Sequence, residues 1–179
     1  MVDFSLGRDL AKAIQLAEEF WAANRNAPIN AKRYAAAIHA LFLAQNPRLF
    51  QFEEFSFLYT ALDCCFRLTQ TVIGEERRIR HSDRIAWMCE RFGVATPSWA
   101  RKVNGGAVEV TDIRNDAVHE ALFMGEPLGF ALQGVGSDEN LTLEMSALIC
   151  RFLVALIGAT SASYVRSPIG TRQLHELVL

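Results

Sequence analysis

An arginine, an amide and a histidine stand close together in one short stretch of the chain. Arg114 and Asn115 are adjacent, and His119 follows four residues after Asn115. A histidine with a near-neutral pKa can accept and donate a proton within one turnover. An arginine neutralises phosphate charge and contributes most when that charge spreads over the oxygens of a transition state. Together these residue types suit RNA cleavage, without a metal ion, by attack of a 2′-hydroxyl on the adjacent phosphate.

The three side chains take different parts in that reaction. His119 serves as general base or acid, Arg114 stabilises the phosphorane-like state, and Asn115 orients a ribose hydroxyl or a phosphate oxygen. The alternative interpretation is purely structural. In that case the motif is a surface helix on which Arg114 and Asp116 are solvated and His119 satisfies a backbone carbonyl.

The spacing of the motif limits how its side chains can meet. On a regular α-helix Asn115 and His119 share a face because they are four residues apart. Arg114 and His119 are five residues apart, which places them about 140° apart around the helix axis. Arg114 can therefore join His119 only through its long side chain, through a distorted turn, or across a dimer interface.

Helical periodicity dominates the rest of the chain. Apolar residues recur at the spacing of an amphipathic helix in six segments, at about 10–23, 30–45, 52–73, 82–92, 111–123 and 140–159. With hardly any strand pattern, this predicts an all-α, up-and-down helical bundle of five to six helices. We expect one domain over residues 1–179, with its motif-bearing core at about 30–160 and an irregular tail over 160–179.

Local signals set the expected helix ends. The predicted N-terminal caps are Asn30, Ser82, Asn140 and either Thr111 or Asp112. Gly74 and Gly93 are the predicted stops of the third and fourth helices. The connections 94–109 and 125–136 are expected to be loops, and the short flanks of Asn104-Gly105 favour a loop over a small hairpin there.

The third predicted helix, from Phe52 to Ile73, is the most apolar segment and is expected to be central. Asp63 and Arg67 stand out on it, four residues apart. One interpretation is an ion pair within the helix. The other is that Asp63 or Tyr59 faces a cleft.

The polar stretch that follows this helix is rich in basic residues, namely Arg77, Arg78, Arg80, His81 and Arg84. It is either a solvated loop or a patch that contacts phosphate. The chain has 15 arginines against three lysines. Arginine suits bidentate phosphate recognition, although genome composition can produce the same bias. The net charge of −2 excludes a strongly basic surface over the whole molecule.

Large apolar side chains are expected inside the bundle. Trp21, Phe42 and Leu143 are predicted to face the core, together with Trp87 and Trp99. Trp99 is the tryptophan with an alternative role, because its basic neighbours would suit a platform for base stacking. The four cysteines lack the spacing of a disulfide framework or a zinc site and are expected to be free thiols.

Several functional classes are not supported. No apolar run approaches the ~20 residues of a membrane span, and the first residues do not resemble a signal peptide, so we expect a cytoplasmic protein with no membrane partner. We find no Gly-rich phosphate loop, no nucleophile elbow and no His/Asp/Glu cluster at ligand spacing. Neither a cofactor nor a metal ion is therefore expected.

The stretch from Ile113 to Glu120 resembles the signature of the HEPN family, in which an arginine, often followed by asparagine, precedes a histidine by a few residues. The apolar segment Phe52–Asp63, with its aromatic and acidic residues, is similar to the long central helix of prokaryotic HEPN-like proteins. The resemblance covers roughly residues 30–160. It implies a bundle of four or five helices, usually a homodimer in which the two motifs face each other across the interface.

By position, Arg114 and His119 match the two signature residues and Asn115 the frequent polar neighbour. The resemblance implies a metal-independent endoribonuclease, a hydrolase-class nuclease with RNA as substrate, in a toxin–antitoxin or phage-defence setting with an antitoxin or defence-system partner. Other family members lack catalysis and bind RNA, a nucleotide or a protein partner. A third alternative is an unrelated helical protein. Ala121 stands where one subgroup has a tyrosine, so regulation through that tyrosine is not expected.

Overall fold

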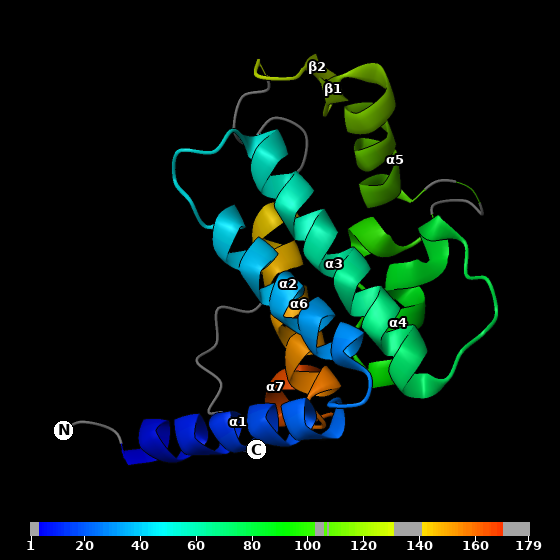
Figure 1. The fold of residues 1–179 in the computed structure, drawn as a ribbon. Coiled ribbons are helices and arrows are strands. Elements are labelled where there is room, and N and C mark those ends of the chain that lie inside the picture. Colours follow the sequence, from blue (N-terminus) through cyan, green and yellow to red (C-terminus); the bar gives the residue numbers. More distant parts are fainter. Residues whose placement is uncertain (1–3, 103–105, 107, 131–140, 170–179) are drawn as a thin grey trace.

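The central element is the long helix α3 (Gln51–Ile73), which packs against three other helices: α2 (Pro28–Ala44), α4 (Arg84–Phe92) and α6 (Leu141–Leu156). The structure is a computed structural model that describes residues 4–102, 106, 108–130 and 141–169. The predicted all-α bundle is confirmed. Figure 1 shows α3 crossing the middle of the molecule with α2 running beside it and α6 behind α2.

The remaining elements lie around this core. They are α1 (Phe4–Ala23), α5 (Glu109–Asn115), α7 (Ser163–Arg166), the 3₁₀ turns η1 (His81–Asp83) and η2 (Ser98–Ala100), the π turn η3 (Asp116–Glu120), and the hairpin of β1 (Leu122–Phe123) and β2 (Glu126–Pro127). In Figure 1, α5 and the hairpin stand at the top of the molecule and α1 lies at the bottom. The hairpin falls where we expected the loop 125–136 to begin, and that expectation was wrong for residues 126–127.

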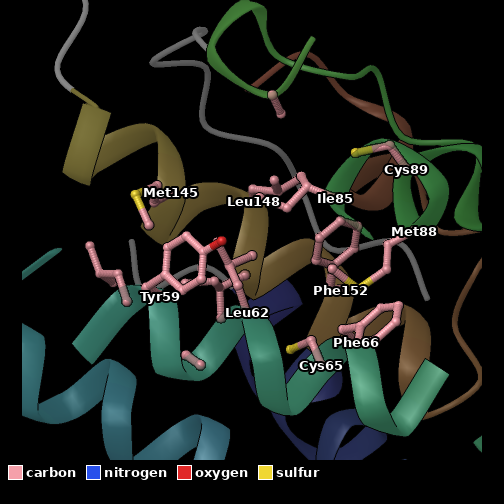
Figure 2. Packing of buried hydrophobic residues seen from close by; sticks show 14 of the residues in the cluster. Tyr59, Leu62, Cys65, Phe66, Ile85, Met88, Cys89, Met145, Leu148 and Phe152 are labelled. Atoms are coloured by element: carbon pink, nitrogen blue, oxygen red, sulfur yellow. The ribbon is translucent and has the colours of Figure 1, made fainter. Parts of the chain in front are cut away.

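The central position of α3 follows from its composition. Its side chains Leu62, Cys65 and Phe66 meet Leu148 and Phe152 of α6 in one buried cluster (Figure 2).

The helix begins with the Glu53 carboxylate accepting a hydrogen bond from the Phe50 N–H at 2.9 Å, half of a capping box. It ends at Gly74, where φ is 71°, a left-handed conformation that glycine adopts without strain. The predicted stop is confirmed.

Other helix ends differ from the sequence prediction. The second helix begins at Pro28, not at a cap on Asn30, because proline suits the first helical position. Asn30 lies inside the helix, where its side chain donates to Asn24 Oδ1 at 3.1 Å. Ser82 lies inside η1 instead of capping α4, and α1 begins at Phe4, six residues earlier than expected. Gly93 ends α4 as predicted, with φ 66°.

Predicted features near the gaps are only partly visible. Asn104, Gly105, Asn140 and residues 170–179 lie outside the described residues. Lys102 and Val108 form an isolated antiparallel bridge, so the flanks of Asn104-Gly105 pair where we expected a plain loop.

Three side chains predicted to be inward are exposed: Trp21 by 58%, Phe42 by 68% and Leu143 by 55%. For α6 the choice of face was wrong, since the buried side is the one that carries Met145, Leu148, Ile149 and Phe152. Amphipathic spacing alone could not separate these two faces, because 12 of the 16 residues of α6 are apolar and they lie on all sides of the helix.

Trp87 and Trp99 are buried, as predicted. The Trp99 indole N–H donates to Glu144 Oε2 at 2.8 Å, which satisfies its polar group and excludes it from a base-stacking role. The four cysteines are free thiols. No described helix is long and apolar enough to cross a membrane.

The contrast between Phe55 and Phe42 tests the assignment of the core. Phe55 on α3 is 1% exposed and packs edge-on against Phe123 with ring centroids 5.4 Å apart. We expect Phe55→Ala to lower the free energy of unfolding by about 3–5 kcal/mol. The matched variant Phe42→Ala should change it by less than about 0.5 kcal/mol. Urea unfolding followed by circular dichroism measures both, and equal losses would contradict the assignment.

Candidate functional site

The motif lies where an α-helix widens into a π turn. Helix α5 begins at Glu109 after Val108, so the predicted cap at Thr111 or Asp112 was wrong. The helix ends at Asn115, and the next five residues form the π turn η3, closed by a hydrogen bond from the Ala121 N–H to the Asp116 carbonyl. Ala121 itself adopts a left-handed conformation with φ 55°.

The π turn alters the spacing problem of the motif. Hydrogen bonds from residue i to i+5 bring residues five apart toward one side, as the i to i+4 bonds of an α-helix do for residues four apart. The angle between Arg114 and His119 is therefore smaller than the ~140° of a regular α-helix. Arg114 could join His119 through its long side chain, through a distorted turn or across a dimer interface. The π turn is such a distorted turn.

The three motif side chains occupy different environments. Arg114 and Asn115 are half-buried, and the Arg114 guanidinium donates to Asn115 Oδ1 at 3.2 Å. His119 is exposed on the outer side of the π turn, and within the described part of the chain it makes no hydrogen bond or ion pair. The fold thus joins Arg114 to Asn115 and leaves His119 open to solvent.

A second group of polar side chains, from α3, η1 and α4, is joined by hydrogen bonds and ion pairs, and we call it the Asp63 cluster: Tyr59, Asp63, His81 and Arg84. The Asp63 carboxylate accepts from Arg84 Nη1 at 2.8 Å, and the same oxygen lies 3.8 Å from His81 Nε2. The predicted Asp63–Arg67 pair was wrong, since Arg67 points away and donates to Gln70 Oε1 at 3.3 Å. The cluster joins α3, η1 and the first residue of α4.

Tyr59 connects this cluster to the motif helix. Its hydroxyl lies 3.3 Å from His81 Nδ1, and it also hydrogen-bonds with the side chain of Thr111 on α5. Burial raises the pKa of Tyr59 to about 12, with the nearby Asp63 carboxylate adding to the effect. Tyr59 is therefore a neutral hydrogen-bonding group at physiological pH and does not transfer protons itself.

His81 is held toward its neutral form. Partial burial lowers the pKa of His81 below 6.5, the Arg84 and Arg114 guanidinium groups lower it further, and Asp63 opposes them. The positive charge of Arg114 also lowers the pKa of Tyr59, against the larger effect of burial. A neutral imidazole beside an arginine can accept a proton at physiological pH.

Within the cluster, the Arg84 guanidinium and the Asp63 carboxylate balance each other's charge. Arg84 lies over the Phe66 ring, 4.6 Å from its centroid, and its buried Nε has no hydrogen-bond partner in the described residues. Arg114, outside the cluster, carries a further guanidinium. A phosphate would offer acceptors to guanidinium groups such as these.

The basic stretch divides into two parts. Arg77, Arg78 and Arg80 are exposed, and Arg77 forms a weak ion pair with Glu75 at 3.8 Å. His81 and Arg84 instead turn into the Asp63 cluster. Both interpretations of the stretch therefore hold in part: the first three arginines are solvated, and the last two basic residues belong to a built site.

Sequence reasoning missed the assembly of this cluster. The available signal was Tyr59 and Asp63, two polar side chains one turn apart on the most apolar helix, which needed partners from elsewhere in the fold. His81 and Arg84 had been grouped with the exposed basic stretch, and their distance along the chain from Asp63 gave no reason to pair them with α3.

Comparison with known proteins gave no significant match to family models, to curated sequences or to solved structures. The HEPN resemblance therefore depends on the motif and on the order of the helices. Within the described residues, no group of three or more His, Cys, Asp and Glu side chains is arranged to hold a metal ion.

The electrostatics of the cluster can be tested through the titration of His81. We expect its pKa to lie below 6.5 in the wild type. Asp63→Asn should lower this pKa further because a stabilising negative charge is lost, whereas Arg84→Gln should raise it because a repelling positive charge is lost. Two-dimensional NMR of the histidine ring protons measures all three values. The same shift in both variants would contradict the proposed geometry.

Proposed function

We propose that the chain is a metal-independent endoribonuclease of HEPN type. The observation that carries the proposal is the hydrogen bond from the Arg114 guanidinium to Asn115 Oδ1 at 3.2 Å, directly before the π turn that bears the exposed His119. A scissile phosphate bound at Arg114 would contact its guanidinium. The guanidinium would stabilise the negative charge on the phosphate oxygens most strongly in the transition state. In this arrangement Asn115 holds the guanidinium in place and presents its amide to the ribose or the phosphate.

The reaction that fits these groups is an intramolecular transfer. The ribose 2′-oxygen attacks the adjacent phosphorus, the bond to the 5′-oxygen of the next nucleotide breaks, and the products are a 2′,3′-cyclic phosphate and a 5′-hydroxyl. His119 exchanges a proton with a reacting oxygen, and Arg114 stabilises the phosphorane-like state. The exposure of His119 suits a role in proton transfer, because a long polymeric substrate can reach the imidazole from solvent.

We further propose that the protein acts as a homodimer with the two motifs at the interface. Val118, beside His119, is 58% exposed, so the outer side of the π turn offers an apolar contact to a second copy. The proposed setting is a cytoplasmic toxin–antitoxin or phage-defence system with an antitoxin or defence-system partner. This setting comes from the family resemblance alone.

A second candidate is a non-catalytic module that binds RNA, a nucleotide or a protein partner. One observation favours it: the His119 side chain has no hydrogen-bond partner in the described residues to fix its orientation, whereas a catalytic imidazole is usually held by one. The Arg114 guanidinium suits anion binding equally well in both cases.

Cleavage of RNA in the presence of EDTA separates the two candidates. We expect the wild type to cleave RNA and to leave 2′,3′-cyclic phosphate ends. His119→Ala and Arg114→Ala should each reduce the rate by about 10²–10⁴-fold, because each removes a group used only in the reaction. End-group analysis with gel electrophoresis measures both the rate and the chemistry.

Two exposed residues supply matched controls, His39 on α2 and Arg48 in the connection after it. His39→Ala and Arg48→Ala remove the same residue types away from the motif and should cleave at the wild-type rate. Wild-type rates in His119→Ala would refute the ribonuclease proposal. Binding of RNA without any product in all proteins would support the non-catalytic module.

Mixing two inactive variants tests whether the site is shared between subunits. If Arg114 of one subunit works with His119 of the other, a heterodimer of Arg114→Ala and His119→Ala contains one intact site, and we expect activity to return on mixing. Each variant alone should remain inactive. Analytical ultracentrifugation establishes that mixed dimers form. Dimers that exchange subunits without regaining activity would show that each site lies within one chain.

A further inference from the structure

Charge is distributed unevenly along this chain. Residues 67–102, from the last turns of α3 through α4, contain eight arginines and lysines but only four acidic residues. This part carries a net charge of +4, and the rest of the chain carries −6, since the whole chain carries −2. An acidic protein that gathers its basic side chains in one part of its fold presents a local surface for an anionic partner.

Three of these arginines lie around a single carboxylate. Glu75 Oε2 lies 3.8 Å from Arg77 Nη2 and 4.0 Å from Arg91 Nη2. Arg67 donates to Gln70 Oε1 at 3.3 Å, and the Gln70 amide in turn donates to the Arg77 carbonyl at 3.5 Å. The Glu75 side chain is 19% exposed, whereas that of Arg77 is 70% exposed and that of Arg91 44%. We call Arg67, Arg77 and Arg91 the arginine face.

Two buried aromatic rings support the arginine face from below. Phe66 and Trp87 pack edge to face with ring centroids 5.7 Å apart. The Arg67 guanidinium lies 5.8 Å from the Phe66 centroid, and the Arg91 guanidinium lies 5.8 Å from the Trp87 centroid. Cation–π attraction acts at these distances and restrains both side chains. The positive charge is therefore held at defined positions on the surface.

The connection between α3 and α4 extends this charge along α3. Arg78 and Arg80 are exposed and form no ion pair within the described residues. The connection then reaches η1, where the His81 ring lies 3.3 Å from the Tyr59 hydroxyl. In Figure 1 the connection forms the right-hand edge of the molecule below α5. Exposed arginines thus follow α3 from its end at Gly74 back to the level of Tyr59.

The motif segment packs on the same part of α3. Phe55, one turn before Tyr59, contacts Phe123 of β1 with ring centroids 5.4 Å apart. Strand β1 in turn contacts both η3 and α5. The row of exposed arginines therefore ends at the region of α3 that carries the motif segment.

We propose that the arginine face, together with Arg78 and Arg80, is the docking surface for the sugar–phosphate backbone of single-stranded RNA. The inference rests on the proposed function, in which RNA is the substrate, and it names the surface that holds the strand outside the motif. Guanidinium groups suit this role because their planar fork donates two parallel hydrogen bonds to phosphate oxygens. A single strand fits because the attacking 2′-oxygen must lie in line with the departing oxygen, which a regular duplex prevents.

This surface contacts phosphates and does not read bases. Its aromatic rings, Phe66 and Trp87, are only 1% and 7% exposed, so neither can stack on a base. Contacts to phosphate position a strand without carrying sequence information. We therefore expect binding by this surface to depend strongly on salt and to be the same for different base sequences.

An RNA that cannot be cleaved tests the surface separately from catalysis. The probe is a fluorescent 2′-O-methyl oligonucleotide, which lacks the attacking hydroxyl, and fluorescence anisotropy in a series of KCl concentrations measures its Kd. We expect Arg67→Gln/Arg77→Gln/Arg91→Gln to bind about 10–100-fold more weakly at physiological salt. The slope of log K against log[KCl] should become shallower by about 2, because each lost phosphate contact removes about 0.7. U-rich and A-rich probes should lose affinity equally.

The matched control removes three exposed arginines from other parts of the surface, namely Arg25, Arg48 and Arg166. Arg25→Gln/Arg48→Gln/Arg166→Gln changes the net charge by the same amount and should keep the wild-type affinity and slope. Equal losses in this control would show that total charge, and not the arginine face, decides RNA affinity, and would overturn the inference.

A second variant protects the test against unfolding. Arg77→Gln/Arg78→Gln/Arg80→Gln leaves the two arginines over the aromatic rings in place, and we expect it to weaken binding to a similar degree. Thermal unfolding establishes that each variant is folded. Wild-type RNA affinity in both folded variants would refute the docking surface.

The outcomes separate this inference from the proposed function. If the arginine variants bind RNA normally but His119→Ala abolishes cleavage, the docking surface fails and the ribonuclease function holds. If the wild type neither binds nor cleaves RNA, both fail. Val72 and Ile73, exposed beside the arginine face, would suit a membrane surface. Vesicles containing phosphatidylglycerol test this alternative: if the variants lose vesicle binding and keep RNA affinity, the partner is a lipid surface and the inference is overturned.

Discussion

The arrangement of the candidate site depends on one partly exposed carboxylate on the most apolar helix of the protein. Asp63 binds Arg84 at 2.8 Å and lies 3.8 Å from His81, so it attaches η1 and the start of α4 to α3. One turn earlier, Tyr59 contacts Thr111 and attaches α5. Two segments that are distant in sequence, η1 with the start of α4 and α5, are thereby fixed to two positions one turn apart on α3. Without the Asp63 carboxylate, the half-buried Arg84 guanidinium would lose its ion-pair partner.

Much of the fold could be predicted because it follows from local pattern. The apolar run of α3 and the glycines at 74 and 93 act within a few residues, and the bundle follows from such segments. The first residues of the helices were harder to predict. For α2, both Pro28 and Asn30 are start signals, and the helix begins at Pro28. For α5, the N-cap position is occupied by Val108, an apolar residue that gives no capping signal. For α6, apolar residues on all sides of the helix carry little information about which face is buried, and the buried Arg151 adds a misleading polar position.

The candidate site likewise has a part that local sequence pattern predicts and a part that depends on the fold. Arg114, Asn115 and His119 were recognisable because they lie within six residues of one another. The partnership of Asp63 with Arg84 spans 21 residues, and two readings of Asp63 were open until the fold was known. The π turn was also beyond sequence reasoning, because no residue type specifies it. It is the element that changes how the motif side chains are directed, and such turns occur often at functional sites.

At the opposite end of the bundle, a buried arginine joins α6 to the segment that follows α7. Arg151 of α6 is 3% exposed, and its guanidinium donates to the Ser167 and Pro168 carbonyls, to the Ser167 hydroxyl and to the Ala147 carbonyl. Arginine keeps its proton throughout the pH range that proteins meet, and carbonyl groups do not titrate. These hydrogen bonds are therefore insensitive to acid, and they keep α6 joined to Ser167 and Pro168 at every pH at which the chain stays folded.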